Sequence, residues 1–252
     1  MAVYARYRFG NEVHYGLVNG GTIAELRGGL FDPQVTTGRT LALSDVTLLA
    51  PCEPPKILAV GLNYRSHLGA RPVPQNPGIF YKPVSSIQNP GGPIVIPPEA
   101  IDLHYEGELV VVIGTTVSKA SREQARAAVF GVTCGNDVSD RNWQRGEGKD
   151  LQWWRAKGSD TFSPFGPFIV TGIDYGDLGL ETRLNGEVVQ SQRTSDLIFD
   201  IPEVVRFISQ WVTLVPGDIV YSGTPGETRR MKPGDVVEVA IQGVGTLSNP
   251  VA

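Results

Sequence analysis

The chain has 252 residues and a mass of 27.2 kDa, with 41% hydrophobic and 19% charged residues. This length suits one large domain, or a small domain joined to a larger one, and this composition excludes intrinsic disorder. A formal net charge of −4 argues against a nucleic-acid partner, because such proteins carry a basic face. No run of 18 apolar residues, no signal-peptide pattern and no CxxC spacing of the two cysteines is present, so we expect a cytoplasmic protein without a membrane partner.

The first 50 residues predict a small β-rich domain. Alternating stretches on either side of Gly10-Asn11 predict a β-hairpin, and a Gly-rich turn at 18–21 leads into a strand at 22–26. The segment 51–55 contains three prolines and predicts a linker. We therefore predict two domains, 1–50 and 56–252.

The second domain is predicted to contain more strand than helix. Its 63–98 segment is rich in Pro, Gly and Asn and predicts mostly loop, which in a compact domain is usually functional or mobile. A capping signature at Ser121–Gln124 opens a predicted helix that continues over 125–130. Asp200 is expected to cap a second helix, with Val204, Val205, Ile208 and Trp211 on one face. A further short helix is predicted at 139–145. Strands are predicted at 56–61, 103–114, 131–136, 168–171, 180–184, 187–190, 219–221 and 236–241. This pattern favours an α+β, β-rich fold.

Two carboxylates interrupt the predicted strand 103–114. Glu106 and Glu108 are two residues apart, so both side chains leave the same face of the strand, and four apolar residues follow at once. Buried together they would repel each other, and a hard divalent cation with oxygen ligands, Mg²⁺ or Mn²⁺, would compensate. A solvated strand end is the alternative. Asp137 follows the next strand and could reach the same ion, whereas Asp140 is a competitor better placed to cap the short helix.

The three histidines carry different expectations. His67 follows a buried strand at the start of the loop-rich segment, which makes it a candidate general base or acid; a surface histidine is the alternative. His14 falls in the amino-terminal hairpin and is interpreted as structural. His104 lies beside the glutamates and is a weak alternative ligand.

Six motifs together resemble the fumarylacetoacetate hydrolase family. They are GLNYRSH (61–67), FYKP (80–83), HYEGELVVVIG (104–114), NDVSDRNWQ (136–144), KGSDTFSPFGP (157–167), and SGTP (222–225) with KPGD (232–235). The resemblance covers residues 56–252, and the first 50 residues look like the small domain that precedes the catalytic domain in many bacterial members. The 2-hydroxyhepta-2,4-diene-1,7-dioate isomerases look most similar.

The resemblance implies a mixed β-roll with few inserted helices, a homodimer, and Mg²⁺ or Mn²⁺ held by Glu106, Glu108 and Asp137. It also implies that His67 and Lys157 are catalytic, with Lys157 close to the metal. The residues that it implies for substrate binding are Tyr64, Lys82, Arg141, Gln144 and Thr224, the last through its hydroxyl and backbone.

One departure from the family pattern bears on the reaction. Hydrolytic and decarboxylating relatives commonly show H-x-x-E, in which the glutamate orients the histidine, but Ala70 occupies that position here. Glu227 is a weak candidate to replace the acid, and Arg141, Arg229 or Arg230 is expected to meet the substrate's distal carboxylate.

The leading hypothesis is isomerisation of 2-hydroxyhepta-2,4-diene-1,7-dioate, with or without decarboxylation of its tricarboxylic precursor. The substrate class is a small dicarboxylic 2-oxo or enol acid. Alternatives are an acylpyruvate or fumarylpyruvate hydrolase, an oxaloacetate decarboxylase or tautomerase, and a non-enzymatic metal- or carboxylate-binding module.

Overall fold

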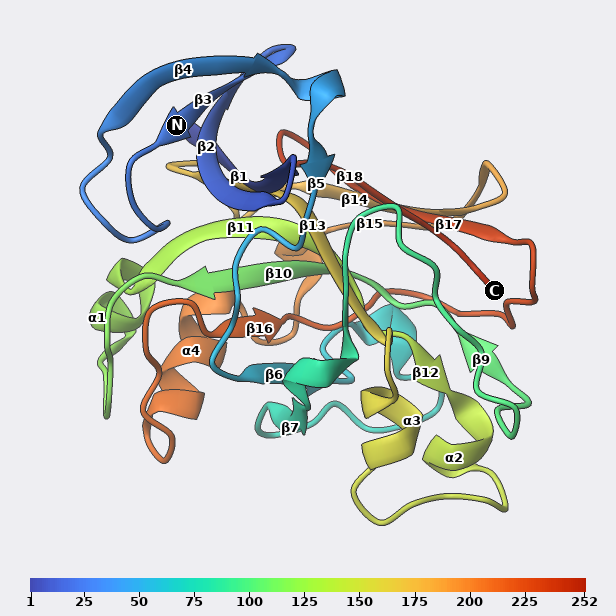
Figure 1. Cartoon of the computed structure of the whole chain (residues 1–252). Helices are drawn as coiled ribbons and strands as arrows, with labels where there is room; N and C mark the ends of the chain where they lie inside the picture. Colours follow the sequence, from blue (N-terminus) through green and yellow to red (C-terminus); the bar gives the residue numbers. More distant parts are fainter.

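A large curved sheet organises the computed structural model, which describes residues 1–252. The sheet has 12 strands, of which β5 (Thr47–Leu48) pairs with β1 and β8 (Ile87–Gln88) with β13. The other strands, in spatial order, are β4 (Thr36–Ala42), β3 (Thr22–Leu26), β2 (Glu12–Asn19), β1 (Ala2–Phe9), β13 (Ser163–Thr171), β11 (Val129–Asn136), β10 (Gly107–Ile113), β16 (Ile219–Tyr221), β6 (Ile57–Gly61) and β7 (Gly78–Lys82). The amino-terminal strands arch over one end of the molecule (Figure 1).

Two smaller sheets and four short α-helices complete the fold. The four-stranded sheet has the order β15 (Glu187–Arg193), β14 (Gly179–Leu184), β17 (Val236–Ile241), β18 (Gly245–Pro250), and the two-stranded one pairs β12 (Ser139–Asp140) with β9 (Leu103–His104). The helices are α1 (Arg122–Ala127), α2 (Arg141–Arg145), α3 (Trp154–Gly158) and α4 (Ile201–Ser209). Helices α2 and α3 lie side by side, close to β9 and β12 (Figure 1). No helix has the length and apolar character needed to cross a bilayer.

Strand β10 divides the interior into two cores. Its alternate residues Leu109, Val111 and Ile113 pack with α4 and the four-stranded sheet in one cluster. Val110 and Val112 point the other way, into a second cluster with β6 and β16. Because successive strand side chains face opposite sides, a fully apolar run suits a strand that is buried on both faces. Every residue of β10 is buried.

The β-rich fold and its principal turns are confirmed. Residues 185 and 186 have φ angles of 54° and 83°, and Leu184 pairs with Glu187, which gives the predicted two-residue hairpin. The capping box of α1 is also present, with the Ser121 hydroxyl accepting from the Gln124 amide at 3.3 Å.

Four local predictions are wrong. The predicted strand 103–114 is split, because β9 pairs with β12 whereas β10 pairs with β11. Helix α1 begins after its predicted cap but ends at residue 127 rather than at residue 130, since β11 begins at residue 129. The predicted short helix over 139–145 begins only at residue 141, because residues 139 and 140 form β12. Trp211 lies beyond the end of α4 and is 74% exposed, so it does not share the buried face of that helix.

The loop-rich segment 63–98 contains more structure than predicted. Strand β7 lies between Pro77 and Pro83 and extends the large sheet by pairing antiparallel with β6. This pairing matters for the site, because β7 carries Phe80 and Lys82.

A buried carboxylate centre as candidate active site

Three carboxylates lie close together where β10 begins and β11 ends. Glu106 precedes β10, Glu108 is its second residue, and Asp137 follows the last residue of β11. Antiparallel pairing of Gly107 with Asn136 brings these chain ends together. One oxygen from each carboxylate lies within 4.8 Å of the others, and the three residues are 1% to 4% exposed. The alternative of a solvated strand end is therefore wrong.

Three buried cations surround two of these carboxylates. Lys157, on α3, contacts Glu106 and lies 2.6 Å from Asp137 through its Nζ atom. The Arg141 guanidinium, on α2, lies 2.5 Å from Glu106. Lys82, at the end of β7, contacts Asp137. Burial alone would raise the pKa of Glu106, but Arg141 and Lys157 outweigh it and hold that pKa well below its usual range.

Glu108 differs from the other two carboxylates because no cation pairs with it. Its carboxylate accepts one backbone hydrogen bond, from the Gly223 amide at 2.6 Å. Burial, together with the charges of Asp137 and Glu106, raises its pKa well above the usual value. Gly223 has φ +103°, and a Cβ there would meet Asn63 at 2.7 Å, so glycine allows this close approach.

The donor set fits a hard divalent cation. Mg²⁺ and Mn²⁺ bind carboxylate oxygens, and the buried Glu108 charge lacks the compensation that such an ion supplies. Glu106, Glu108 and Asp137 would hold the ion. His104 is not placed to be a ligand, because its ring nitrogens lie 2.9 Å from Asp102 and 2.9 Å from Thr228.

His67 is oriented by a backbone carbonyl rather than by an acid. Its Nδ1 lies 2.5 Å from the carbonyl oxygen of Gly226, which can only accept, so Nδ1 carries the proton in this contact. Its Nε2 faces the centre, 3.9 Å from Glu106. Burial lowers the pKa of His67 despite that neighbouring carboxylate. Glu227 is exposed and does not contact this ring, so it does not replace the acid missing at residue 70.

The other candidates separate into cavity-lining and supporting residues. Arg141, Gln144 and Thr224 line a cavity of about 130 Å³ together with His67, Lys157, Glu106 and Glu108. Tyr64 is fully buried and does not line this cavity. Lys82 does not line it either.

Hydrogen-bond counts define what two of the implied binding residues can do. An ammonium has three donors, and those of Lys82 are used by Asp137 and by the carbonyls of Lys157 and Phe162. The Thr224 hydroxyl donates to the Gly107 carbonyl at 2.9 Å, so it has no proton left for a substrate oxygen. Lys82 therefore supports the centre, and Thr224 could meet substrate only through its backbone amide.

Two further predicted residues have structural roles. Asp140 caps α2, accepting from the Trp143 amide at 2.9 Å, as expected for the competitor of Asp137. His14 lies 3.4 Å from Glu25 in the amino-terminal strands, far along the sheet from β10.

Four cavity-lining residues escaped the sequence analysis: Arg71, Phe80, Arg145 and Trp153. Phe80 belongs to the FYKP motif, but nothing in the sequence separates it from a core aromatic residue. Trp153 precedes α3 with φ 55°, and its ring meets Phe80 edge-on at 5.6 Å. Arg71 lies in the long loop and Arg145 at the end of α2, and neither carries a local signal.

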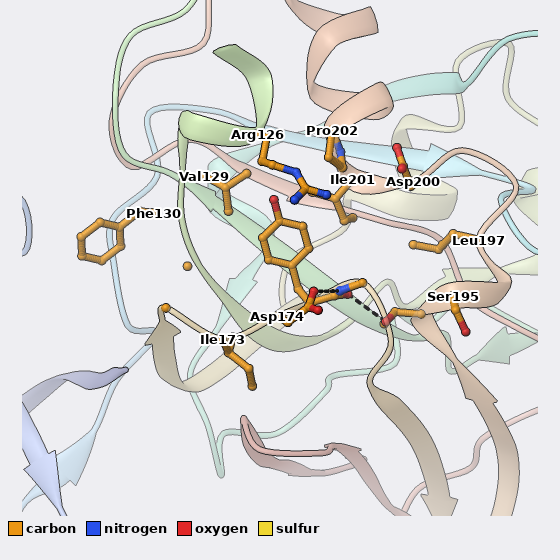
Figure 2. Close-up of a pocket in the computed structure, with 15 residues that line it drawn as sticks. Arg126, Val129, Phe130, Ile173, Asp174, Ser195, Leu197, Asp200, Ile201 and Pro202 are labelled. Atoms are coloured by element: carbon orange, nitrogen blue, oxygen red, sulfur yellow. Dashed lines mark hydrogen bonds between the residues drawn. The ribbon is translucent and has the colours of Figure 1, made fainter. Parts of the chain in front are cut away.

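A larger hollow of about 550 Å³ lies between the end of α1 and the start of α4 (Figure 2). It shares no residue with the carboxylate cavity. Its carboxylates serve the local fold: Asp200 caps α4 through the Glu203 amide at 3.0 Å, and Asp174 accepts from the Gly176 amide at 3.0 Å. The carboxylate cavity is therefore the candidate active site.

The strand-rich fold and the buried centre agree with family membership. Residues 56–252 match the fumarylacetoacetate (FAA) hydrolase C-terminal family, and residues 4–51 match the Rv2993c-like N-terminal family. The chain belongs to the fumarylacetoacetate hydrolase family, whose members are isomerases, hydrolases and tautomerases.

Individual relatives cover most of the chain. Protein Rv2993c of Mycobacterium tuberculosis is 45% identical over 236 residues, which is 91% of this chain and 88% of the relative. The mitochondrial oxaloacetate tautomerase FAHD2A of Bos taurus is 42% identical over 84% of this chain and 71% of its own length. The crystal structure of 2-hydroxyhepta-2,4-diene-1,7-dioate isomerase from Mycobacterium marinum superposes with a TM-score of 0.92 at 40% identity, covering 100% of this chain and 98% of the other.

Proposed function

We propose that this chain is a divalent-metal-dependent isomerase that moves a proton within a small dicarboxylic 2-oxo or enol acid. The leading substrate is 2-hydroxyhepta-2,4-diene-1,7-dioate. The observation that carries the proposal is the buried triad of Glu106, Glu108 and Asp137, of which both glutamates line the same cavity as His67 and Lys157.

The charge of the centre favours a doubly negative ligand. The three carboxylates are matched by the charges of Lys82, Lys157 and Arg141, and a divalent ion would make the centre positive by about two charges. A 2-oxo acid in its enolate form presents two neighbouring anionic oxygens, one from the carboxylate and one at C2. When bound, the metal supplies Lewis-acid stabilisation of the enolate oxygen.

The chain's own residues supply orientation and proton transfer. Lys157 uses two of its three ammonium donors on Glu106 and Asp137, which leaves one donor for a substrate oxygen in the cavity that it lines. His67 presents its unprotonated Nε2 to the cavity and can take the proton of the C2 hydroxyl of the dienol and deliver it to C5, which would give the 2-oxo-3-ene isomer. The Gln144 amide nitrogen remains available beside Arg141.

The arrangement around His67 favours isomerisation over hydrolysis. The acid of the H-x-x-E pattern common in hydrolytic relatives has no counterpart here, because Nδ1 of His67 contacts the neutral Gly226 carbonyl. Moving a proton along a stabilised enolate needs no activated water. This supports proton relocation as the reaction class.

A second candidate within this class is tautomerisation of oxaloacetate. The cavity of about 130 Å³ is small compared with sites for drug-sized ligands, which span roughly 300–1,000 Å³. A four-carbon diacid suits this volume, and a relative 42% identical to the chain is named an oxaloacetate tautomerase.

The test follows ultraviolet absorbance of each substrate with purified protein, with Mg²⁺ or Mn²⁺ and with a chelator. Metal-dependent loss of the dienol band without carbon loss supports the isomerase; metal-dependent decay of enol-oxaloacetate alone supports the tautomerase. Glu108→Gln is expected to reduce turnover at least ~100-fold, whereas Glu238→Gln, on β17, serves as the matched control. Cleavage of an acylpyruvate with neither of the other activities would reject the proposal in favour of a hydrolase.

A further inference from the structure

The arginines first expected to meet a distal carboxylate are already occupied or lie elsewhere. Arg141 binds Glu106 at 2.5 Å, Gln144 at 2.7 Å and Thr228 at 2.8 Å, so it belongs to the metal end of the cavity. Arg229 pairs with Glu187 at 2.8 Å and does not line the cavity. Arg230 does not line it either; its backbone bridges to His104.

Two other arginines line the cavity without any anionic partner. Arg71 and Arg145 form no ion pair with a carboxylate and no side-chain hydrogen bond. They approach the same space from different parts of the chain: Arg71 follows the turn that carries His67, and Arg145 is the last residue of α2. Both side chains are exposed, so their guanidinium groups are accessible to an anion from solution.

The charges of neighbouring guanidinium groups act on Arg145. Partial burial, followed by the like charges of Arg141 and Arg71, lowers the pKa of Arg145. Like charges gathered at a cavity attract anions and raise their local concentration there. A guanidinium presents a planar pair of donors that matches both oxygens of a carboxylate.

The cavity also has an aromatic wall. Phe80 and Trp153 both line it and pack edge-on against each other. The cavity thus combines carboxylates and their cations with two aromatic rings and two arginines. These groups suit a short carbon chain with a carboxylate at each end.

We propose that Arg71 and Arg145 bind the second carboxylate of the substrate and select dicarboxylic over monocarboxylic 2-oxo acids. This inference rests on the proposed function, because it assumes that the first carboxylate lies at the carboxylate triad. Arg71 is four residues from His67 and ends the turn that follows it, so binding of the far carboxylate also fixes the segment that carries the base. Binding energy remote from the reacting carbons then contributes to orientation at those carbons.

The experiment compares a diacid with a monoacid in the same assay. Exchange of the C3 protons with solvent deuterium is followed by proton NMR for oxaloacetate and for 2-oxobutanoate, with Mg²⁺ and the full chain. Arg71→Gln and Arg145→Gln are each expected to lower kcat/KM for oxaloacetate by ~10- to 100-fold and to change 2-oxobutanoate by less than ~3-fold, since the lost contact is a charge-assisted hydrogen bond. Arg229→Gln is the matched control, because it removes the same charge from outside the cavity.

Binding keeps the test independent of turnover. Oxaloacetate and pyruvate are titrated by calorimetry into Mg²⁺-loaded protein, and the preference for the diacid should disappear in the double variant Arg71→Gln, Arg145→Gln. Equal losses for diacid and monoacid, or an unchanged preference, would overturn the assignment of the two arginines. Failure of the proposed function looks different: wild-type protein would then catalyse neither metal-dependent conversion of 2-hydroxyhepta-2,4-diene-1,7-dioate nor metal-dependent exchange with either acid.

Discussion

Glutamine substitutions at Glu106 and Glu108 remove the same charge from positions two residues apart, yet we expect opposite effects on the stability of the metal-free protein. Glu108 has no cation partner and faces two other carboxylates within 4.8 Å. At that distance and an effective dielectric of about 20, each like-charge pair costs about 3 kcal/mol, part of which Lys157 offsets. Glu108→Gln should therefore raise the free energy of unfolding by about 1–3 kcal/mol.

Glu106 has the opposite environment. Its carboxylate pairs with both Arg141 and Lys157, and removing it leaves Arg141 buried without an anion. Breaking one side of a buried ion pair costs about 3–5 kcal/mol, so Glu106→Gln should lower the stability by about that amount. For a chain of this length, the Tm of Glu108→Gln should lie about 2 to 12 °C above that of the wild type, and the Tm of Glu106→Gln about 6 to 20 °C below it.

The assay is thermal or urea unfolding in a chelating buffer, repeated with Mg²⁺ and Mn²⁺. The gain in stability of Glu108→Gln over the wild type should be absent near pH 4 and grow toward pH 8. The reason is that Glu108 loses its proton near pH 4.3 in the unfolded chain but retains it to higher pH in the folded protein. Added metal should stabilise the wild type and not the Glu108 variant. A Glu108→Gln variant less stable than wild type in chelator would refute the assignment of Glu108 as the uncompensated charge.

Three further outcomes follow from single contacts. Lys82→Met should lower the free energy of unfolding by about 3–5 kcal/mol even without metal, because the buried Asp137 carboxylate and two carbonyls each lose a partner. An unchanged Tm with a raised KM would instead support substrate binding by Lys82. Ser66→Ala should lower kcat several-fold with little change in metal affinity. The reason is that the Ser66 hydroxyl accepts a hydrogen bond from the Gly226 amide at 2.9 Å and so holds the turn whose carbonyl orients His67. Equal losses in metal affinity and kcat would contradict this. Burial raises the pKa of Cys52 and of Cys134 to about 12, so a thiol reagent at pH 8 should label neither cysteine in the native protein and both in urea. In the unfolded chain the thiols ionise near pH 8.5. The two cysteines therefore contribute to stability below that pH, and this contribution is lost as the pH rises toward 12. Rapid labelling of the native protein would show that a thiol is accessible.

The carboxylate triad was predictable because its geometry is local. Strand alternation places Glu106 and Glu108 on one face even though the strand breaks between residues 104 and 107. The antiparallel partner of β10 is the next strand in the chain, so Asp137 at its end returns to the same edge. The apolar run after Glu108 indicated burial, which the double-sided core confirms.

The positions of Arg71 and Arg145 at the cavity were not predictable in this way. Arg71 and Arg145 sit in a loop and at a helix end, where neither hydrophobic periodicity nor turn chemistry specifies direction. Their proximity depends on how α2 packs against α3 and on the course of the 63–98 segment. Arg229 and Arg230 looked closer by sequence to a site motif, but Glu187 on the neighbouring hairpin holds Arg229 outside the cavity.

Lys82 and Lys157 show why residue type alone could not assign roles. Both are buried lysines that contact Asp137, and only the acceptors around each ammonium distinguish them. Lys82 has all three donors satisfied, one of them by the carbonyl of Lys157 itself. It therefore anchors the end of α3 and fixes where the Lys157 ammonium lies, which leaves Lys157 with the one free donor at the centre. The different roles of Lys82 and Lys157 thus follow from the packing of β7 against α3, a tertiary contact that no local pattern in the sequence indicates.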